Sequence, residues 1–175
     1  MSLSLKHIFS TKDSNWSFMI ACLEDAFPED ERRSSLDMIR LLSNSPISYH
    51  VILKDALPVG VFNTWDLLLF RYIEHFAIIP SLRGKGLGQQ ILYNYVHQVN
   101  PPVILEVELP NTLLNQRRVE FYKKTGFALC EREYVQPPYD RTKKPVSLKL
   151  MEYGNQLLPE RFDEVVDLLR RTVYM

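Results

Sequence analysis

The amino-acid sequence predicts a single-domain α/β fold, with helices on both faces of a mixed sheet. Three observations lead to this prediction. The chain has 175 residues, a usual length for one domain. Its composition, 46% hydrophobic and 24% charged, is ordinary for a globular protein. Helical and strand periodicities follow one another along the chain in an order that a mixed sheet accommodates.

The N-terminal part predicts one strand and two helices. We expect a strand over 3–9 and then a helix that Pro28 ends. The hydrophobic residues at helical spacing in this helix are Trp16, Met19, Ile20, Leu23 and Phe27. After a charged loop over 28–33, Ser34 and Ser35 are suited to cap a second, short helix. The hydrophobic residues of that helix are Leu36, Ile39 and Leu42.

The middle of the chain predicts three strands and a helix. Segments 49–53 and 59–64 flank a turn over 55–58, a pattern typical of a β-hairpin. Segment 70–79 is a longer strand that ends at Pro80. The hydrophobic face of the following helix comprises Leu87, Ile91, Leu92, Tyr95, Val96 and Val99.

The C-terminal part continues with strands and helices. We expect a strand over 103–109 and a helix over 115–125, with Gly126 as its C′ glycine. Two strands, over 127–135 and 146–153, are joined by a proline-rich loop. The hydrophobic residues of a last amphipathic helix are Phe162, Val165, Val166, Leu169 and Val173.

The division of the chain and its composition narrow the possible functions. We expect residues 1–153 to form the domain and residues 154–175 a helical extension packed on it. Lys plus Arg equals Asp plus Glu at 21 each, which argues against a nucleic-acid-binding protein. Two cysteines exclude a disulfide framework and a Cys-rich zinc module, and we expect no metal. No apolar run approaches the roughly 18 residues of a membrane span, so we expect a cytoplasmic protein without membrane contact.

Three of the six glycines, Gly84, Gly86 and Gly88, fall within five residues between a predicted strand and a helix. Glycine lets the backbone approach a ligand closely, and the first-turn amides of a helix attract anions. Arg83 and Lys85 add two cations to the same loop. The segment therefore predicts a phosphate-binding loop.

The spacing discriminates between known phosphate loops. A Walker A loop needs Ser or Thr after its Gly-Lys pair, and Lys85 is followed by Gly86. A dinucleotide fingerprint would place its last glycine one residue beyond Gly88. Glu106 would suit ribose binding, but the repeated βαβ units of such a sheet are missing. A nucleotide-dependent oxidoreductase remains a less well supported alternative.

The loop resembles the GNAT (Gcn5-related) superfamily of N-acetyltransferases. Arg83-x-x-Gly86-x-Gly88 after a strand is similar to its (Gln/Arg)-x-x-Gly-x-(Gly/Ala) signature. Tyr122, four residues before Gly126-Phe127, and the segment from Phe27 to Arg32 are similar to later and earlier parts of the family pattern. The resemblance implies a mostly antiparallel sheet, acetyl-CoA as co-substrate and an amine as acceptor.

The resemblance also implies how acetyl-CoA is held. The pyrophosphate would lie on the loop formed by Arg83, Gly84, Lys85, Gly86, Leu87 and Gly88. Backbone N–H groups at about Phe76 to Ile78 would polarise the thioester carbonyl, and Asn115 would contact the donor or order the following turn.

Direct transfer to an amine needs an acid and a base. The resemblance gives Tyr122 as the acid that protonates the leaving thiolate. Glu106, between apolar residues on a strand, resembles the glutamate used by ribosomal-protein N-acetyltransferases, and Glu108 points the same way. Glu74 on the preceding strand is a rival base, with His75 expected on the opposite side of that strand. One of the three glutamates is expected to serve.

The acceptor is the least specified part. Five acidic residues lie between Glu24 and Glu31, and the only basic residues nearby in the sequence are Arg32 and Arg33. We expect this acidic segment to favour cationic amines or basic peptide N-termini as acceptors. The alternative to an enzyme is a catalytically inactive acyl-CoA-binding module of the same fold. The oligomeric state stays open, with a homodimer as one option.

Overall fold

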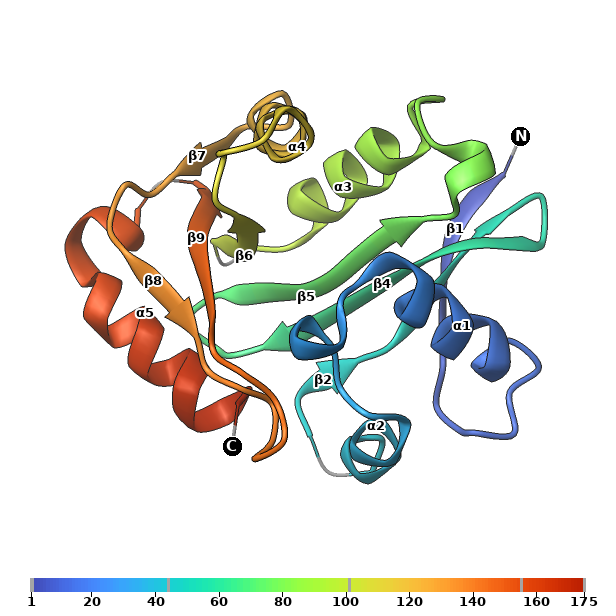
Figure 1. Ribbon diagram of the computed structural model, residues 1–175. Helices are drawn as coiled ribbons and strands as arrows, with labels where there is room; N and C mark the ends of the chain where they lie inside the picture. The colour runs from blue at the N-terminus through green and yellow to red at the C-terminus, as the bar shows by residue number, and fades with distance from the viewer. Residues whose placement is uncertain (1, 44, 101, 155, 175) are drawn as a thin grey trace.

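The computed structural model describes residues 2–43, 45–100, 102–154 and 156–174. Within these ranges the chain forms five α-helices around one sheet (Figure 1). The helices are α1 (Trp16–Ala26), α2 (Ser35–Leu41), α3 (Leu87–Gln98), α4 (Leu113–Lys123) and α5 (Leu158–Thr172). The strands are β1 (Leu3–His7), β2 (Ile47–Ser48), β3 (His50–Lys54), β4 (Leu57–Asp66), β5 (Arg71–Ile78), β6 (Val103–Glu108), β7 (Phe127–Leu129), β8 (Tyr134–Gln136) and β9 (Val146–Tyr153).

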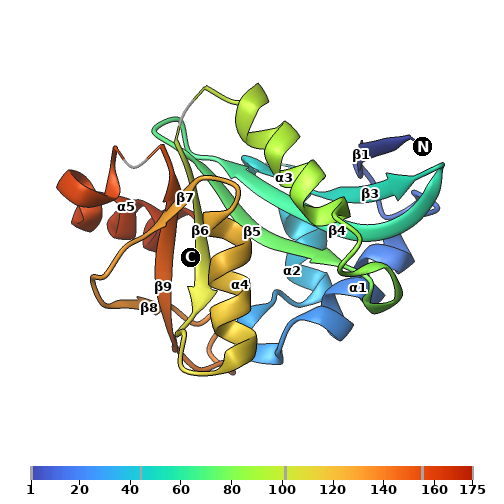
Figure 2. The same cartoon turned by 90° about the horizontal axis from the view of Figure 1, so that it is seen from above.

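The strand order across the sheet is β1-β3-β4-β5-β6-β9-β7, with β2 paired to β4 and β8 to β9. Among the described strands every pair is antiparallel except β5 with β6. That pair is parallel because α3 returns the chain across one face of the sheet between them (Figure 2). The predicted α/β class with a mixed, mostly antiparallel sheet is confirmed.

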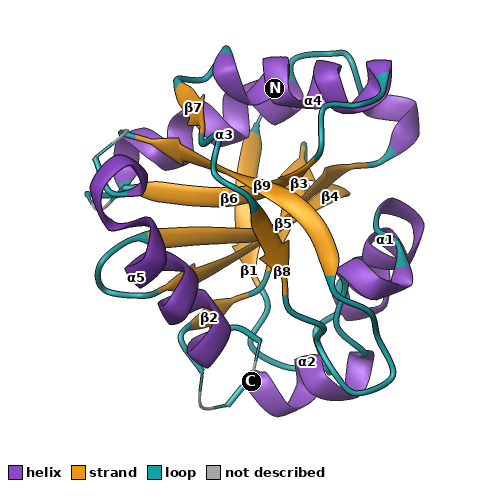
Figure 3. Ribbon diagram, turned by 60° about the vertical axis from the view of Figure 1, so that its left-hand side comes forward, coloured by secondary structure: helices purple, strands orange, loops and turns teal. Residues whose placement is uncertain are grey.

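Helices cover both faces of the sheet (Figures 1 and 3). α3 and α4 pack on one face, and their buried residues include Ile91, Leu92, Val96 and Val119. α1, α2 and α5 pack in the core of the other face, to which they contribute Met19, Leu23, Met38, Val165 and Leu169. The sheet thus separates two hydrophobic cores, as amphipathic helices on both sides require.

The start of α5 is fixed by a buried carboxylate. Glu152 of β9 is fully buried and accepts hydrogen bonds from the backbone N–H groups of Gln156, Leu157 and Leu158 at 2.7, 2.8 and 2.8 Å. Three donors satisfy the buried charge, and a carboxylate at a helix N-terminus is favourable. This contact attaches the C-terminal helix to the central sheet.

β5 and β6 separate after three residue pairs. Arg71, Tyr72 and Ile73 pair with Val103, Ile104 and Leu105, and the register between the two strands ends there. β6 stays paired with β9 along its whole length, so β5 diverges from it. The sheet is therefore open between the C-terminal halves of β5 and β6.

A β-bulge lies at Glu74. Asn63 of β4 pairs with His75, and the next residue, Thr64, pairs with Ile73, so Glu74 has no partner opposite it. A bulge shifts side-chain alternation by one residue. The expectation that Glu74 and His75 face opposite sides is therefore wrong: Glu74 Oε2 lies 3.8 Å from His75 Nδ1.

Two further expectations are corrected. In α2, Leu36 and Ile39 are 66% and 42% exposed and Met38 is buried, because a two-turn helix presents only one narrow stripe to the core. The strand expected over 127–135 is two strands, β7 and β8. Between these two strands, the carbonyl oxygens of Glu131 and Arg132 accept hydrogen bonds from the Lys149 ammonium in place of a strand partner. Ser34 caps α2 as expected, accepting from the Asp37 amide.

Candidate active site

A cleft of about 710 Å³ opens where β5 and β6 separate. Its walls come from the end of β5, the loop that leads into α3, the end of β6, and α4. The lining also includes Phe27, Glu31, Gln136 and Tyr139. The predicted site residues that line it are Glu74, Phe76, Ile78, Arg83, Gly84, Gly86, Leu87, Gly88, Glu106, Glu108 and Tyr122. Lys85 and Asn115 do not line it.

The loop between β5 and α3 presents bare backbone to open space. Gly84 and Gly86 have φ of +74° and +78°, a region that side-chain-bearing residues rarely adopt. A Cβ added at either would meet nothing within 4 Å. Gly86 is the N-cap of α3, so the first-turn amides that follow it lack an acceptor within the helix. These features fit a bound phosphate, as the pyrophosphate of CoA would require.

The other residues of the loop hold it in place. Gly88 allows close packing, because an added Cβ would lie 3.3 Å from the ring of Phe121 and 3.4 Å from that of Phe76. Arg83 Nε donates to the carbonyl oxygen of Ile78 at 2.7 Å, which ties the loop to the end of β5. Lys85 is exposed.

The amides of Phe76 and Ile78 point into the opening. The N–H of Ile79 donates to the carbonyl oxygen of Val59, on the β4 side, at 3.0 Å. Main-chain amides alternate in direction along a strand. The amides of Ile78 and Phe76 therefore point away from β4 and toward the opening between β5 and β6. Both positions fall in the span, about Phe76 to Ile78, where the family resemblance implies donors to a thioester carbonyl.

Glu106 lies in a cluster of tyrosine hydroxyls. Tyr134 of β8 donates to Glu106 Oε1, and the hydroxyl of Tyr174, just beyond α5, lies 2.9 and 2.8 Å from Oε1 and Oε2. Burial raises the pKa of Glu106 to about 7, although the hydroxyls of Tyr134, Tyr174 and Tyr72 oppose the rise. A carboxyl that is half ionised near neutral pH suits proton transfer.

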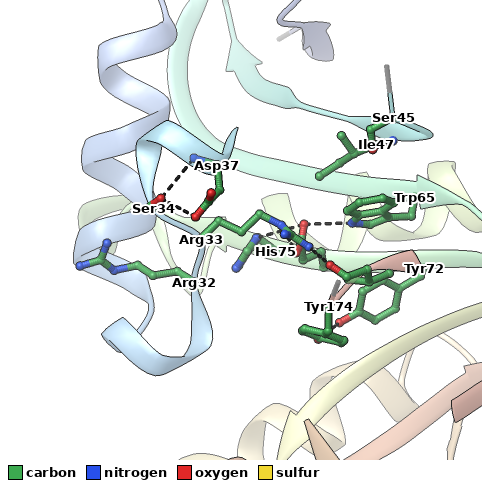
Figure 4. Close-up of polar contacts among 12 residues, drawn as sticks. Arg32, Arg33, Ser34, Asp37, Ser45, Ile47, Trp65, Tyr72, His75 and Tyr174 are labelled. Carbon is green, nitrogen blue, oxygen red and sulfur yellow. Dashed lines mark hydrogen bonds and ion pairs between the residues drawn. The ribbon is translucent and has the colours of Figure 1, made fainter. Parts of the chain in front are cut away.

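Glu74 is committed to an ion pair. Arg33 Nε donates to its Oε1 at 2.9 Å and Trp65 Nε1 donates to its Oε2 at 3.0 Å. Arg33 extends from the turn before α2 toward Trp65 and Tyr174 (Figure 4). Burial alone would raise the pKa of Glu74, but Arg33, His75 and Trp65 lower it below its ordinary value. Glu74 is therefore a weaker base than Glu106.

Glu108 and Asn115 also have partners. Glu108 forms an ion pair with Arg118 of α4. Asn115 Nδ2 donates to the carbonyl oxygen of Leu109 at 2.9 Å, and its backbone N–H donates to Thr112, the N-cap of α4. In this position Asn115 orders the turn between β6 and α4.

Tyr122 of α4 lines the cleft and also belongs to the core. Its ring packs edge-on against Phe121 and Phe127, with centroid distances of 5.1 and 5.8 Å. Burial raises the pKa of Tyr122 to about 12, with Arg118 opposing the rise. The phenol therefore stays protonated at neutral pH and is available as a proton donor.

The sequence did not predict the residues that shift the pKa values of the Glu74 and Glu106 carboxyls. Five residues contact Glu106 or Glu74 directly or through one another: Tyr72, Tyr134, Tyr174, Arg33 and Trp65. The one available signal was Tyr72, which precedes Glu74 by two residues on the same strand. The others come from remote segments that no periodicity connects.

The acidic segment is held by hydrogen bonds from the loop between β8 and β9. Lys143 donates to the carbonyl oxygens of Glu29 and Arg32, and the amide of Lys144 donates to Asp30 Oδ1 at 3.0 Å. Neither contact places a lysine ammonium on a carboxylate. Of the two arginines expected to answer the acids, Arg32 lies 4.0 Å from Glu24, whereas Arg33 pairs with Glu74. Of the five acids, Glu31 lines the cleft. Burial, followed by Glu108, raises its pKa.

Two absences hold for the part of the chain that the structure describes. Its His, Cys, Asp and Glu side chains form no group of three that could hold a metal ion. None of its helices is long and apolar enough to cross a membrane.

Comparison with known proteins identifies the family. Residues 13–127 match the model of the acetyltransferase (GNAT) family. A solved structure from Bacteroides thetaiotaomicron, assigned to the GNAT acetyltransferases, is 31% identical, covers 98% of both chains and has a TM-score of 0.91. No curated protein matches the sequence.

More distant solved structures share the fold. Arabidopsis thaliana Naa50, in complex with the bisubstrate analogue CoA-Ac-MVNAL, is 18% identical with a TM-score of 0.61 over 87% of this chain and 98% of its own. A spermidine N-acetyltransferase SpeG chimera from Vibrio cholerae and hSSAT is 16% identical with a TM-score of 0.64 over 89% and 100%. Together with the family model, the relative that is 31% identical shows that this chain belongs to the GNAT family of acetyltransferases.

Proposed function

We propose that the protein is an N-acetyltransferase that moves the acetyl group of acetyl-CoA directly to a primary amine. The observation that carries the proposal is one cleft lined by a phosphate-binding loop, a carboxyl with a pKa of about 7 and a buried phenol. Solved structures of the same fold include a complex with the bisubstrate analogue CoA-Ac-MVNAL and a chimera whose name makes it a spermidine N-acetyltransferase.

The loop from Arg83 to Gly88 would hold the pyrophosphate, and the amides of Phe76 and Ile78 would donate hydrogen bonds to the thioester oxygen. Acetyl-CoA supplies the thioester, whose C–S bond breaks as the amine nitrogen bonds to the acetyl carbon. Glu106 takes the proton that the amine loses, directly or through a water molecule. Tyr122 gives its proton to the leaving sulfur and regains one from solvent, so protons and charge balance over the cycle.

Among the three glutamates, we assign the base to Glu106. Glu74 is held by Arg33 and Trp65 with a lowered pKa, and Glu108 is paired with Arg118. Among the described residues, Glu106 receives only neutral hydroxyl donors. A base must release its proton again near neutral pH, and a pKa of about 7 meets that need.

Two measurements test this function. The first compares thermal stabilisation by acetyl-CoA, CoA, ATP and NADH. We expect only the first two to stabilise the protein, whereas stabilisation by NADH alone would favour an oxidoreductase. The second measures release of the CoA thiol with a panel of primary amines, in wild type, Glu106→Gln and the control Glu120→Gln, whose exposed carboxylate pairs with Lys123. Stabilisation by acetyl-CoA without thiol release from any amine would favour the inactive acyl-CoA-binding module.

A further inference from the structure

The residues that follow α5 contact Glu106 directly and Glu74 through Arg33, and both glutamates line the cleft. α5 ends at Thr172, and Val173 and Tyr174 that follow are 1% and 8% exposed. The carbonyl oxygen of Val173 accepts a hydrogen bond from Arg33 Nη2, and Arg33 also binds Glu74. The hydroxyl of Tyr174 lies on both carboxyl oxygens of Glu106. This short segment therefore connects the two buried carboxyls.

The direction of the hydrogen bonds follows from proton counting. Each tyrosine hydroxyl has one proton to donate. If Tyr174 donates to the Glu106 carboxylate, it must accept from Tyr72, whose hydroxyl lies 2.9 Å from its own. The chain of donors then runs from Tyr72 through Tyr174 to Glu106. Tyr134 supplies a second donor to the same carboxylate from β8.

We infer that Tyr174 is a positioning residue for acetyl transfer: its hydroxyl orients the Glu106 carboxylate in the cleft and stabilises its charged form. The inference rests on the proposed role of Glu106 as the base. It assigns part of the active site to residues beyond the span 13–127 that the family model matches.

Several groups act on Glu106 from the elements packed around it. Burial raises its pKa most, and Glu74 of β5 raises it further, while the hydroxyls of Tyr134, Tyr174 and Tyr72 lower it. Arg33 is bound to Glu74, and Tyr139 lies beside Tyr174 with their ring centroids 5.0 Å apart. Because Tyr174 favours the carboxylate over the carboxylic acid, its removal raises the pKa of Glu106.

The test uses Tyr174→Phe with Tyr49→Phe as its control. Both remove one hydroxyl from a buried ring, and the Tyr49 hydroxyl has no hydrogen-bond partner among the described residues. In Tyr174→Phe we expect the apparent pKa of kcat/KM to rise by about one unit, as the loss of a hydrogen bond to a charged acceptor predicts. Affinity for acetyl-CoA should not change, and Tyr49→Phe should keep the wild-type profile.

A second readout does not depend on turnover. The Glu106 carboxyl carbon is titrated by NMR in wild type, Tyr174→Phe and Tyr49→Phe, with Glu106→Gln to assign the signal. A rise in pKa confined to Tyr174→Phe supports the inference even if no amine is acetylated, and the proposed function then fails alone. An unchanged Glu106 pKa in a folded Tyr174→Phe overturns the inference. If that variant does not fold, Tyr72→Phe takes its place, where a smaller rise supports the inference and no rise overturns it.

Discussion

Glu74 and Glu106 lie on adjacent strands where β5 and β6 separate, and their pKa values move in opposite directions although both carboxyls are buried. The difference comes from their donors. Glu74 receives a guanidinium and an indole N–H, whereas Glu106 receives tyrosine hydroxyls. A full positive charge outweighs burial and neutral hydroxyls do not, so neighbouring glutamates acquire different chemistry.

Replacing Glu106 should act on catalysis. In Glu106→Gln we expect kcat to fall by about 10²- to 10⁴-fold, as for other general bases. In the wild type, kcat/KM should rise with pH through about 7, because only the carboxylate accepts a proton. Steady-state thiol release between pH 5 and 9 would measure both. A pH profile that is the same in Glu106→Gln and wild type would remove Glu106 from the reaction.

The same carboxyl should make stability depend on pH. The pKa of Glu106 is raised from an ordinary 4.5 to about 7 in the folded state, so the native protein binds the proton more tightly than the unfolded chain. Its stabilising effect is complete below 4.5 and is lost as the pH rises through about 7. The difference in unfolding free energy between wild type and Glu106→Gln, from urea titrations, should therefore fall over this window. A flat difference would contradict the raised pKa.

Replacing Glu74 should act mainly on folding. The Arg33 and Glu74 side chains are 5% and 0% exposed, so Glu74→Gln leaves a buried guanidinium without its counter-ion. Losing one partner of a buried pair typically costs about 3–5 kcal/mol. Urea unfolding of Glu74→Gln beside Glu120→Gln, an exposed ion-pair partner, would measure this. Equal stabilities for the two variants would show that the buried pair contributes little.

Gly86→Val should abolish stabilisation by acetyl-CoA. Valine is strained at φ of +78°, and its side chain would occupy the open space beside the loop. Gly154→Val is the matched control, with similar strain at φ of +102° in a residue outside the cleft lining. Both variants should lose stability in thermal shift assays, and only Gly154→Val should regain it with acetyl-CoA. Equal responses to acetyl-CoA would place the pyrophosphate elsewhere.

Glu31 should favour cationic acceptors. It is the acid of the 24–31 segment that lines the cleft, so Glu31→Gln should reduce the rate with a diamine more than with an uncharged amine. Glu29→Gln, outside the lining, is the control. The diamine preference should also weaken with added salt, because ions screen the attraction. Diamine and uncharged-amine rates that respond equally to Glu31→Gln would exclude this selectivity.

Most of the fold and part of the candidate site could be predicted from the sequence. The loop from Arg83 to Gly88 could be found because phosphate binding needs glycines at fixed spacing after a strand. The choice among Glu74, Glu106 and Glu108 could not, because it depends on Arg33 and Arg118 and on contacts between remote segments. Tyr174 lies 68 residues from Glu106, and no local pattern relates the two.

The bulge at Glu74 also sets the phase of the main chain along β5. Before it, the amide of Arg71 donates to the carbonyl oxygen of Pro102, on the β6 side. Counting in steps of two from Arg71 would direct the amide of Ile79 toward β6 as well, yet that amide donates to Val59 on the β4 side. The extra residue thus reverses which positions direct their amides toward β6. As a result, Phe76 and Ile78 present their amides to the cleft. In an unbulged strand of the same residues, regular alternation from Arg71 would instead direct the amides of His75 and Ala77 toward the opening, and those of Phe76 and Ile78 toward β4.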